Sequence, residues 1–238
     1  MIMWRTLFIL LFIFLLTACQ SISESLENLS KETQPKAKEE DTMNQQLIDS
    51  AKRGDTKKVL NLLKDGADIN TTNEHGITAV LAATKNHKTE TVEVLIQQGA
   101  DINIQNNIQD NVLLYAGAEG FLDIVKLAVE AGADTTLTNR YGGTALIPAS
   151  ERGHVAVVKE LLAHSDTDVN HINNLNWTAL LEAIILSNGG KDHQKIVQLL
   201  VDHGADLNIS DGDGVKPLEH AQNNGYHEIV DILKEAGA

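Results

Sequence analysis

Apolar residues return at helical spacing along most of this 238-residue chain. Clear examples are Val92, Leu95 and Ile96, then Ile124, Val125 and Leu127, and later Ile196, Val197, Leu199 and Leu200. Because positions three and four apart share one face of an α-helix, each cluster predicts an amphipathic helix. Shorter stretches of alanine and other small residues, such as 79–84 and 145–150, precede these clusters. They predict partner helices that approach closely, which fits an aromatic content of only 4%.

A short polar segment follows each predicted amphipathic helix and returns at a fixed period. The five copies are 66–70, 99–103, 132–136, 166–170 and 204–208, spaced 33, 33, 34 and 38 residues apart. Four of them begin with glycine, which suits a left-handed helix cap. Residues 236–238 begin a sixth copy. A period in this range predicts a stacked-repeat solenoid, in which neighbouring copies complete each other's core.

The residues between these segments carry a second pattern. The second copy reads Gly76-Ile77-Thr78-Ala79-Val80, the fourth reads Gly142-Gly143-Thr144-Ala145-Leu146, and the sixth reads Gly214-Val215-Lys216-Pro217-Leu218. Gly153-His154 opens the second helix of the fourth copy. These segments resemble the ankyrin repeat, whose pattern contains Gly-x-Thr-Pro-Leu-His-x-Ala-Ala, then Gly-His, and then Gly-Ala-Asp-x-Asn.

The resemblance covers residues 43–238 and implies an all-α repeat solenoid. About six ankyrin repeats are expected, each a helix pair with β-turn or hairpin connections, at 43–70, 71–103, 104–136, 137–170, 171–208 and 209–238. The fifth repeat carries about five extra residues within 187–193, between its two helices. Such insertions map to loops on one edge and are often tolerated.

The first eighteen residues predict a signal peptide. Arg5 precedes the apolar run 7–16, which ends in Leu16-Thr17-Ala18-Cys19. This ending resembles the bacterial lipoprotein lipobox, which implies that Cys19 is lipidated, palmitate included, and becomes the first mature residue. An ordinary secretory signal with an incidental cysteine is the alternative. Residues 19–42 are then the lipidated cysteine and a disordered tether, and the expected location is the cell membrane, facing away from the cytoplasm.

Charge narrows the class of partner. Without residues 1–18 the chain has 18 Lys and Arg against 33 Asp and Glu, a net charge of −15. An acidic surface repels phosphate backbones and anionic headgroups, so we expect no nucleic-acid binding and membrane contact through the lipid only. A basic or neutral protein partner is weakly favoured.

Motifs that carry chemistry are not recognisable in the sequence. It contains no zinc-protease, nucleophile-elbow or phosphate-loop pattern, so we expect no enzyme activity, cofactor, metal or small-molecule substrate. Segment 206–212 resembles the start of a calcium loop, but Pro217 stands where the bidentate glutamate belongs. His154, His203 and His220 are interpreted as structural. Glu182 occupies a position that the repeat pattern keeps apolar, so it needs an internal hydrogen-bonding partner.

In ankyrin domains the turn tips and first helices line a concave binding groove. Transferring those positions by resemblance gives ten predicted partner contacts: His75, Ile77, Ile108, Asp110, Arg140, Tyr141, Arg152, Leu175, Trp177 and Asp213. Further positions of this kind are Glu74, Lys85, Asn86, Glu119, Glu151, Asn174 and Val215. Arg140, Tyr141 and Trp177 are expected at equivalent places in adjacent repeats, as a binding hot spot. The alternative is that Tyr141 and Trp177 pack against the next turn.

Three functional hypotheses follow. The leading one is a lipid-anchored, exported scaffold that binds another protein of the envelope or medium. The second is an envelope antagonist or immunity-type protein that binds and blocks a toxin or hydrolase. The third is an enzyme with an unrecognised site near Glu182 and neighbouring histidines.

Overall fold

The computed structural model describes residues 39–238, and residues 46–238 form one compact unit. The predicted signal peptide, Cys19 and most of the predicted tether lie outside the described residues. The described chain opens with a helix over residues 39–53, so residues 39–42, which we expected to be disordered tether, are helical. Among residues 39–238, no helix combines the length and the apolar composition that crossing a membrane requires.

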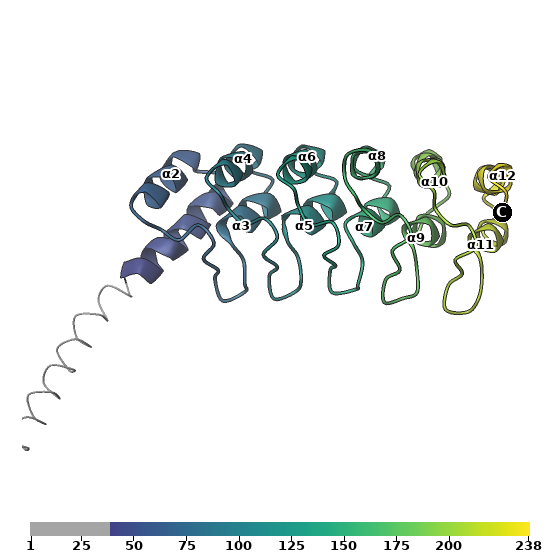
Figure 1. The fold of residues 1–238 in the computed structure, drawn as a ribbon, viewed down its shortest axis with the longest axis horizontal. Helices are drawn as coiled ribbons and strands as arrows, with labels where there is room; N and C mark the ends of the chain where they lie inside the picture. The colour runs from purple at the N-terminus through teal and green to yellow at the C-terminus, as the bar shows by residue number, and fades with distance from the viewer. Residues whose placement is uncertain (1–38) are drawn as a thin grey trace, which may run out of the picture. The chain divides into compact units, whose positions relative to one another are not determined.

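Paired antiparallel helices build the compact unit. After residues 46–53 and α2 (Thr56–Lys64), the pairs are α3 (Ala79–Lys85) with α4 (Thr89–Gln97), α5 (Val112–Glu119) with α6 (Leu122–Glu130), α7 (Leu146–Glu151) with α8 (Val155–His164), α9 (Ala179–Ile185) with α10 (Lys191–Asp202), and α11 (Pro217–Asn223) with α12 (His227–Glu235). Figure 1 shows α3, α5, α7, α9 and α11 in one row, which we term the inner row. The second helices form the outer row, and long turn loops extend beyond the inner row. The predicted all-α solenoid is confirmed.

Packing is almost entirely between neighbours. Each inner helix contacts the outer helix of its own pair and the inner helices before and after it, as α7 does with α8, α5 and α9. Ala79, Ala83 and Leu81 of α3 are fully buried as a result. In α5, a Cβ on Gly117 would lie 3.1 Å from the Ala145 Cβ, so a small residue is needed where the chain of the next repeat crosses.

Side-chain caps begin α3, α5 and α9. The Thr78 and Thr178 hydroxyls and the side-chain oxygen of Asn111 each accept the backbone N–H three residues later. Helix α7 differs, because Pro148 has no N–H to donate to the Thr144 carbonyl. Ile147 donates to that carbonyl instead, and the buried Thr144 hydroxyl has no partner within the described chain.

The insertion in the fifth repeat packs against the sixth. Residues 186–190 connect α9 to α10, and α10 is 12 residues long where α4, α6 and α12 have 9. The Tyr226 hydroxyl donates to the Ser187 carbonyl at 2.7 Å, and the Gln194 side chain donates to the Gly189 carbonyl at 2.8 Å. The extra residues therefore form a connection that is anchored to the next helix pair.

Candidate partner-binding groove

Five turn loops, at 73–78, 106–111, 139–144, 173–178 and 211–216, share one hydrogen-bonding scheme. The first side chain of each loop accepts the N–H groups two and four residues later, at 2.9–3.1 Å; these acceptors are Asn73, Asn106, Asn139, Asn173 and Asp211. The first of those two donors is the residue at the tip, such as Ile108, Tyr141 or Leu175. Because the N–H of the tip residue and the N–H two residues later are bound to one side chain, each loop holds its tip residue on a rigid support.

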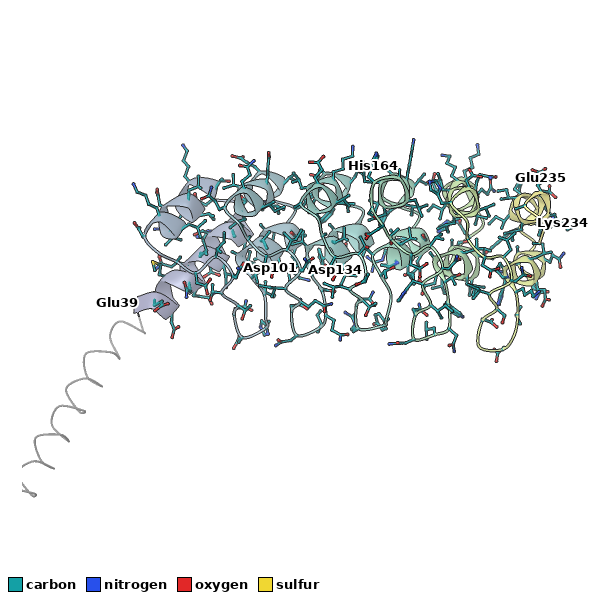
Figure 2. All side chains as sticks on the ribbon, in the orientation of Figure 1. Glu39, Asp101, Asp134, His164, Lys234 and Glu235 are labelled. Carbon is teal, nitrogen blue, oxygen red and sulfur yellow. The ribbon has the colours of Figure 1, made fainter. Side chains whose placement is uncertain are left out.

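Backbone bonds also join neighbouring loops. Asn107 N–H donates to the His75 carbonyl and Asn174 N–H donates to the Tyr141 carbonyl, both at 3.0 Å. At the ends of the outer helices, Asp101 N–H donates to the Asn70 side chain, and Asp134 N–H makes the same bond to Asn103. Figure 2 shows Asp101 and Asp134 at matching places in successive repeats. These bonds join the turn loop of the second repeat to that of the third and the loop of the fourth to that of the fifth, and they join the ends of successive outer helices.

A groove of about 560 Å³ lies between α5, α7 and α9 and the turn loops of the third, fourth and fifth repeats. Its rim is apolar: Ile108, Tyr141 and Leu175 are tip residues that are 47%, 56% and 52% exposed, and Leu186 is 49% exposed. Large apolar side chains that gather around one concavity and stay exposed are typical of a docking surface.

Two of the cations that line the groove are held within it. Lys85 Nζ lies 3.3 Å from Asp110 Oδ2 and 3.8 Å from the centre of the Tyr115 ring. Arg152 donates to Glu119 Oε1 and to the Ala118 carbonyl, both at 2.7 Å. These contacts join the second repeat to the third and the third repeat to the fourth along the groove.

Arg140 lines the groove without an ion pair. Its guanidinium lies over the Tyr141 ring at 4.6 Å, and no carboxylate within residues 39–238 pairs with it. The pair therefore offers a stacked aromatic face and an available cation at one turn tip.

Glu182 stands at the base of the groove on α9 and is 5% exposed. Asn173 Nδ2 donates to Glu182 Oε1 at 2.6 Å, so the expected internal hydrogen-bonding partner is confirmed. Burial raises the pKa of Glu182, the negative charge of Glu151 raises it further, the hydrogen bond from Asn173 lowers it, and the net result is a pKa of about 7. Protonated and ionised forms of this carboxyl group therefore coexist near neutral pH.

Six of the ten predicted contacts line the groove: Ile108, Asp110, Arg140, Tyr141, Arg152 and Leu175. His75, Ile77 and Asp213 belong to turn loops at either side and are not among its lining residues. Trp177 is not a lining residue either, and it is half-buried.

The expected equivalence of Trp177 with Tyr141 is wrong. Asn173 N–H donates to the Trp177 carbonyl, just as Asn139 N–H donates to the Gly143 carbonyl. Trp177 therefore corresponds to Gly143, and Leu175 is the residue that corresponds to Tyr141. The fifth loop has Asn176, with a φ of 60°, where the fourth has Gly142, so no glycine marks the register in the sequence.

Sequence reasoning missed Leu186, Tyr115 and Asn173 as lining residues. The sequence does carry a signal for Asn173, because Asn or Asp recurs at the start of every turn loop. It carries no signal for Leu186, whose exposure depends on the path of the longer connection after α9.

The three histidines interpreted as structural have structural contacts. The His154 ring bonds the Ala118 carbonyl at 3.1 Å, the His203 ring bonds the Leu199 carbonyl at 2.7 Å, and the His220 ring bonds Asp211 at 2.7 Å. In segment 206–212, Asp206 accepts the Asn208 N–H, as the turn requires. Residues 39–238 contain no group of three or more His, Cys, Asp or Glu placed to hold a metal ion.

Two solved structures resemble this chain over most of its length. An ankyrin repeat domain from Acinetobacter baumannii AYE has 48% sequence identity and a TM-score of 0.79, covering 81% of this chain and 97% of that one. The ankyrin repeat protein EF0377 has 40% identity and a TM-score of 0.77, covering 79% and 96%.

Curated relatives match over shorter stretches. The ankyrin repeat protein YahD of Escherichia coli (strain K12) is 52% identical over 81 residues, which are 34% of this chain and 40% of YahD. The human BCL-6 corepressor-like protein 1 is 39% identical over 77 residues, 32% of this chain and 4% of that protein. The matched stretch is thus less than half of either relative.

The family model for three copies of the ankyrin repeat matches residues 47–139, 113–211 and 146–238. Together these matches extend over all the helix pairs from α3 to α12. The chain therefore belongs to the ankyrin-repeat family.

Proposed function

We propose that this protein is a lipid-anchored, exported scaffold that binds another protein through the groove. One observation carries the binding role: Ile108, Tyr141, Leu175 and Leu186 remain exposed around a single concavity although the chain buries apolar residues efficiently elsewhere. Burying them against a partner is favourable by about 25 cal/mol per Å² of apolar surface.

The rigid turn loops that carry these side chains favour tight binding. The hydrogen bonds of each turn loop already hold the N–H of the tip residue and the N–H two residues later, so little backbone freedom is lost on association. Tyr141 with Arg140 stacked on it has the composition of a binding hot spot. Ankyrin repeats typically mediate interactions between proteins, which agrees with this role.

The groove is tested by crosslinking in cells, followed by mass spectrometry of the captured proteins. The test variant is Tyr141→Ala/Leu175→Ala. Its matched control is Leu60→Ala/Ile172→Ala, which removes two exposed apolar side chains, 40% and 47% exposed, that do not line the groove. We expect a protein that is captured by the wild type and the control but not by the test variant. Equal capture by all three would refute the groove as the binding site.

The anchor rests on Cys19 and its flanking residues. Cells fed an alkyne-tagged palmitate should label the wild-type protein and leave Cys19→Ala unlabelled. The wild type should sediment with membranes and be cleaved by protease added outside the cytoplasm. A labelled Cys19→Ala variant, or a wild-type protein protected inside the cytoplasm, would contradict the proposal.

The captured partner also decides between scaffold and antagonist. If the partner is a toxin or a hydrolase, its activity should fall when the purified wild-type protein is added and should be unchanged by the groove variant. A partner without such activity favours the scaffold.

A further inference from the structure

The cations and carboxylates that line the groove are unevenly paired. Lys85 and Arg152 are each bound to a carboxylate of the groove, Asp110 and Glu119 respectively, and Arg140 lies over the Tyr141 ring at a turn tip without a carboxylate partner. Glu151 and Glu182 also line it, and neither carboxylate has a cationic partner within residues 39–238. The negative charge of Glu151 acts on Glu182, so the two groups share one electrostatic environment. The base of the groove therefore has an unbalanced negative charge when both are ionised.

Glu182, which lines the groove, has an oxygen that accepts no hydrogen bond from residues 39–238. The side chain is 95% buried, being 5% exposed, and still lines the groove. Asn173 Nδ2 bonds one oxygen, Oε1, and the other oxygen has no hydrogen-bond partner among the described residues. The carboxyl group is largely withdrawn from water and receives one hydrogen bond, so a ligand that donates to its free oxygen improves the compensation for burial.

Apolar side chains line the same groove as these carboxyl groups. Tyr141 and Leu175 stand at turn tips, and Leu186 follows α9. A long side chain with an aliphatic stem and a cationic end matches this arrangement, because its stem covers apolar surface and its end reaches acceptors.

We infer that the groove binds a partner segment whose lysine or arginine side chain enters between the apolar rim residues and pairs with Glu151 and Glu182. This inference rests on the groove being the partner-binding site, and it adds the chemistry of the segment that is bound. Charge complementarity supports it at two scales: the two unpaired carboxylates at the base, and the excess of 33 acidic over 19 basic residues in the whole chain. An acidic field of this kind speeds the approach of a basic partner.

Binding of a cation should release a proton from Glu182. Burial and Glu151 hold the pKa of Glu182 at about 7 in the free protein, whereas a neighbouring ammonium or guanidinium favours the ionised form. Below pH 7 the bound cation must displace a proton, so affinity falls as pH falls. Between pH 8 and pH 6 the expected loss is about tenfold for one linked proton.

Other charged or ionisable groups lie on the helices that pack against α9. They are Glu151 on α7, Lys191, Asp192, His193, Lys195 and Asp202 on α10, and Glu219 and His220 on α11. Arg152 follows α7 and is bound to Glu119. His193 bonds the Glu151 carbonyl and His220 bonds Asp211, so both are already engaged. The variant Glu182→Gln isolates the contribution of Glu182, because it leaves all of these groups in place.

The test uses full-length protein to select binders from a random-peptide display library. Selections run in parallel on the wild type, on Glu151→Gln/Glu182→Gln and on Tyr141→Ala/Leu175→Ala, with circular dichroism to check that each is folded. The best peptide is then synthesised in two forms, one with its basic residue and one with norleucine in that position, and Kd is measured at pH 8 and pH 6.

The expected result is that peptides enriched on the wild type carry Lys or Arg beside an apolar residue and lose at least tenfold in affinity on both variants. The basic peptide should bind wild type about tenfold more weakly at pH 6 than at pH 8, and the norleucine peptide should show no such change. On Glu182→Gln the pH dependence should disappear.

The outcomes separate the two proposals. Peptides that depend on Tyr141 and Leu175 but contain no basic residue would overturn this inference and leave groove binding intact. Peptides with a basic residue that bind Glu151→Gln/Glu182→Gln as tightly as wild type would also overturn it. Enrichment that ignores Tyr141 and Leu175, or no enrichment on the wild type, counts against both proposals.

Discussion

Glu182 places a carboxyl group on a helix position where the preceding repeats have Ala82, Tyr115 and Pro148. Folding removes it from water, and a single hydrogen bond from Asn173 compensates only in part, so its pKa rises to about 7. In the unfolded chain the same group ionises at its ordinary value of 4.5. Between these values the folded state holds more protons, so this residue lowers the stability of the fold as pH rises from about 4.5 to about 7.

Glu182→Gln should remove that pH-dependent loss. The neutral amide keeps the shape of the side chain and still accepts from Asn173. Relative to wild type, the free energy of unfolding of the variant should increase by about 2 kcal/mol more at pH 8 than at pH 5.5. Urea unfolding at the two pH values measures this difference. A difference that does not change with pH would show that Glu182 is ionised throughout the range.

The first residue of each turn loop is the second single position on which local structure depends, because its side chain holds the loop backbone. Asn139 accepts the Tyr141 and Gly143 N–H groups, at 2.9 Å and 3.1 Å, and Asp211 makes the same two bonds in the sixth repeat.

Asn139→Ala should lower the free energy of unfolding by about 1–2 kcal/mol, because two backbone donors lose their acceptor. Asn139→Asp should be close to wild type, since a carboxylate serves that purpose at Asp211. Thermal unfolding followed by circular dichroism compares the three proteins. Equal losses for both variants would mean that the amide group itself is required.

At the scale of the element, the turn between an inner and an outer helix requires a left-handed backbone and leaves little space for a side chain. Gly120 ends α5 with a φ of 74°, and the His154 ring of the next repeat packs directly against it. A Cβ at Gly120 would lie 2.6 Å from His154 Nδ1, while His154 also bonds the Ala118 carbonyl. Gly132, which follows α6, has a similar φ of 77° but nothing within 4 Å of a new Cβ.

Gly132→Ala should therefore reveal the cost of the left-handed backbone alone, about 1–2 kcal/mol. Gly120→Ala should cost more, by about 1–3 kcal/mol, because the new methyl group displaces the His154 ring. Denaturant unfolding of the two variants gives the comparison. Similar losses would indicate that His154 moves aside without cost.

For the whole molecule, stability is distributed along a line of neighbours. Helix α6 lies between α4 and α8, whereas α12 contacts α10 and its own partner α11 and is the last helix of residues 39–238. Ile124 in α6 and Ile229 in α12 are both fully buried. The same truncation can therefore be placed inside the stack or at its end.

Ile229→Ala should detach the end of the stack, and Ile124→Ala should weaken its centre, each removing about 2–5 kcal/mol locally. Trp177 is the only tryptophan in residues 39–238, so its fluorescence reports on the fifth repeat. In Ile229→Ala, the circular dichroism signal should fall at lower urea than the Trp177 signal. In Ile124→Ala the two signals should stay closer together and shift down together. Coincident transitions in Ile229→Ala would mean that the terminal repeat unfolds only with the rest.

The sequence by itself determined the helices, their pairing and the period. These features depend on local information: apolar residues at helical spacing, caps such as Thr78 and Asn111, and glycine after the outer helices. It also indicated that Glu182 needs a partner and that the turn tips face a partner protein, the second through resemblance. Cys19 and the anchor remain predictions from sequence.

Only the tertiary structure decided which of these residues meet. The loop register that separates Trp177 from Tyr141 is set by backbone bonds across a turn that lacks its glycine. The groove brings together side chains from Lys85 to Leu186, which lie far apart in the chain. The pKa of Glu182 depends on burial by neighbouring helices and on Glu151, a residue of the preceding repeat. Contacts between repeats depend on how each copy stacks on the next, and a repeat period fixes that stacking only on average.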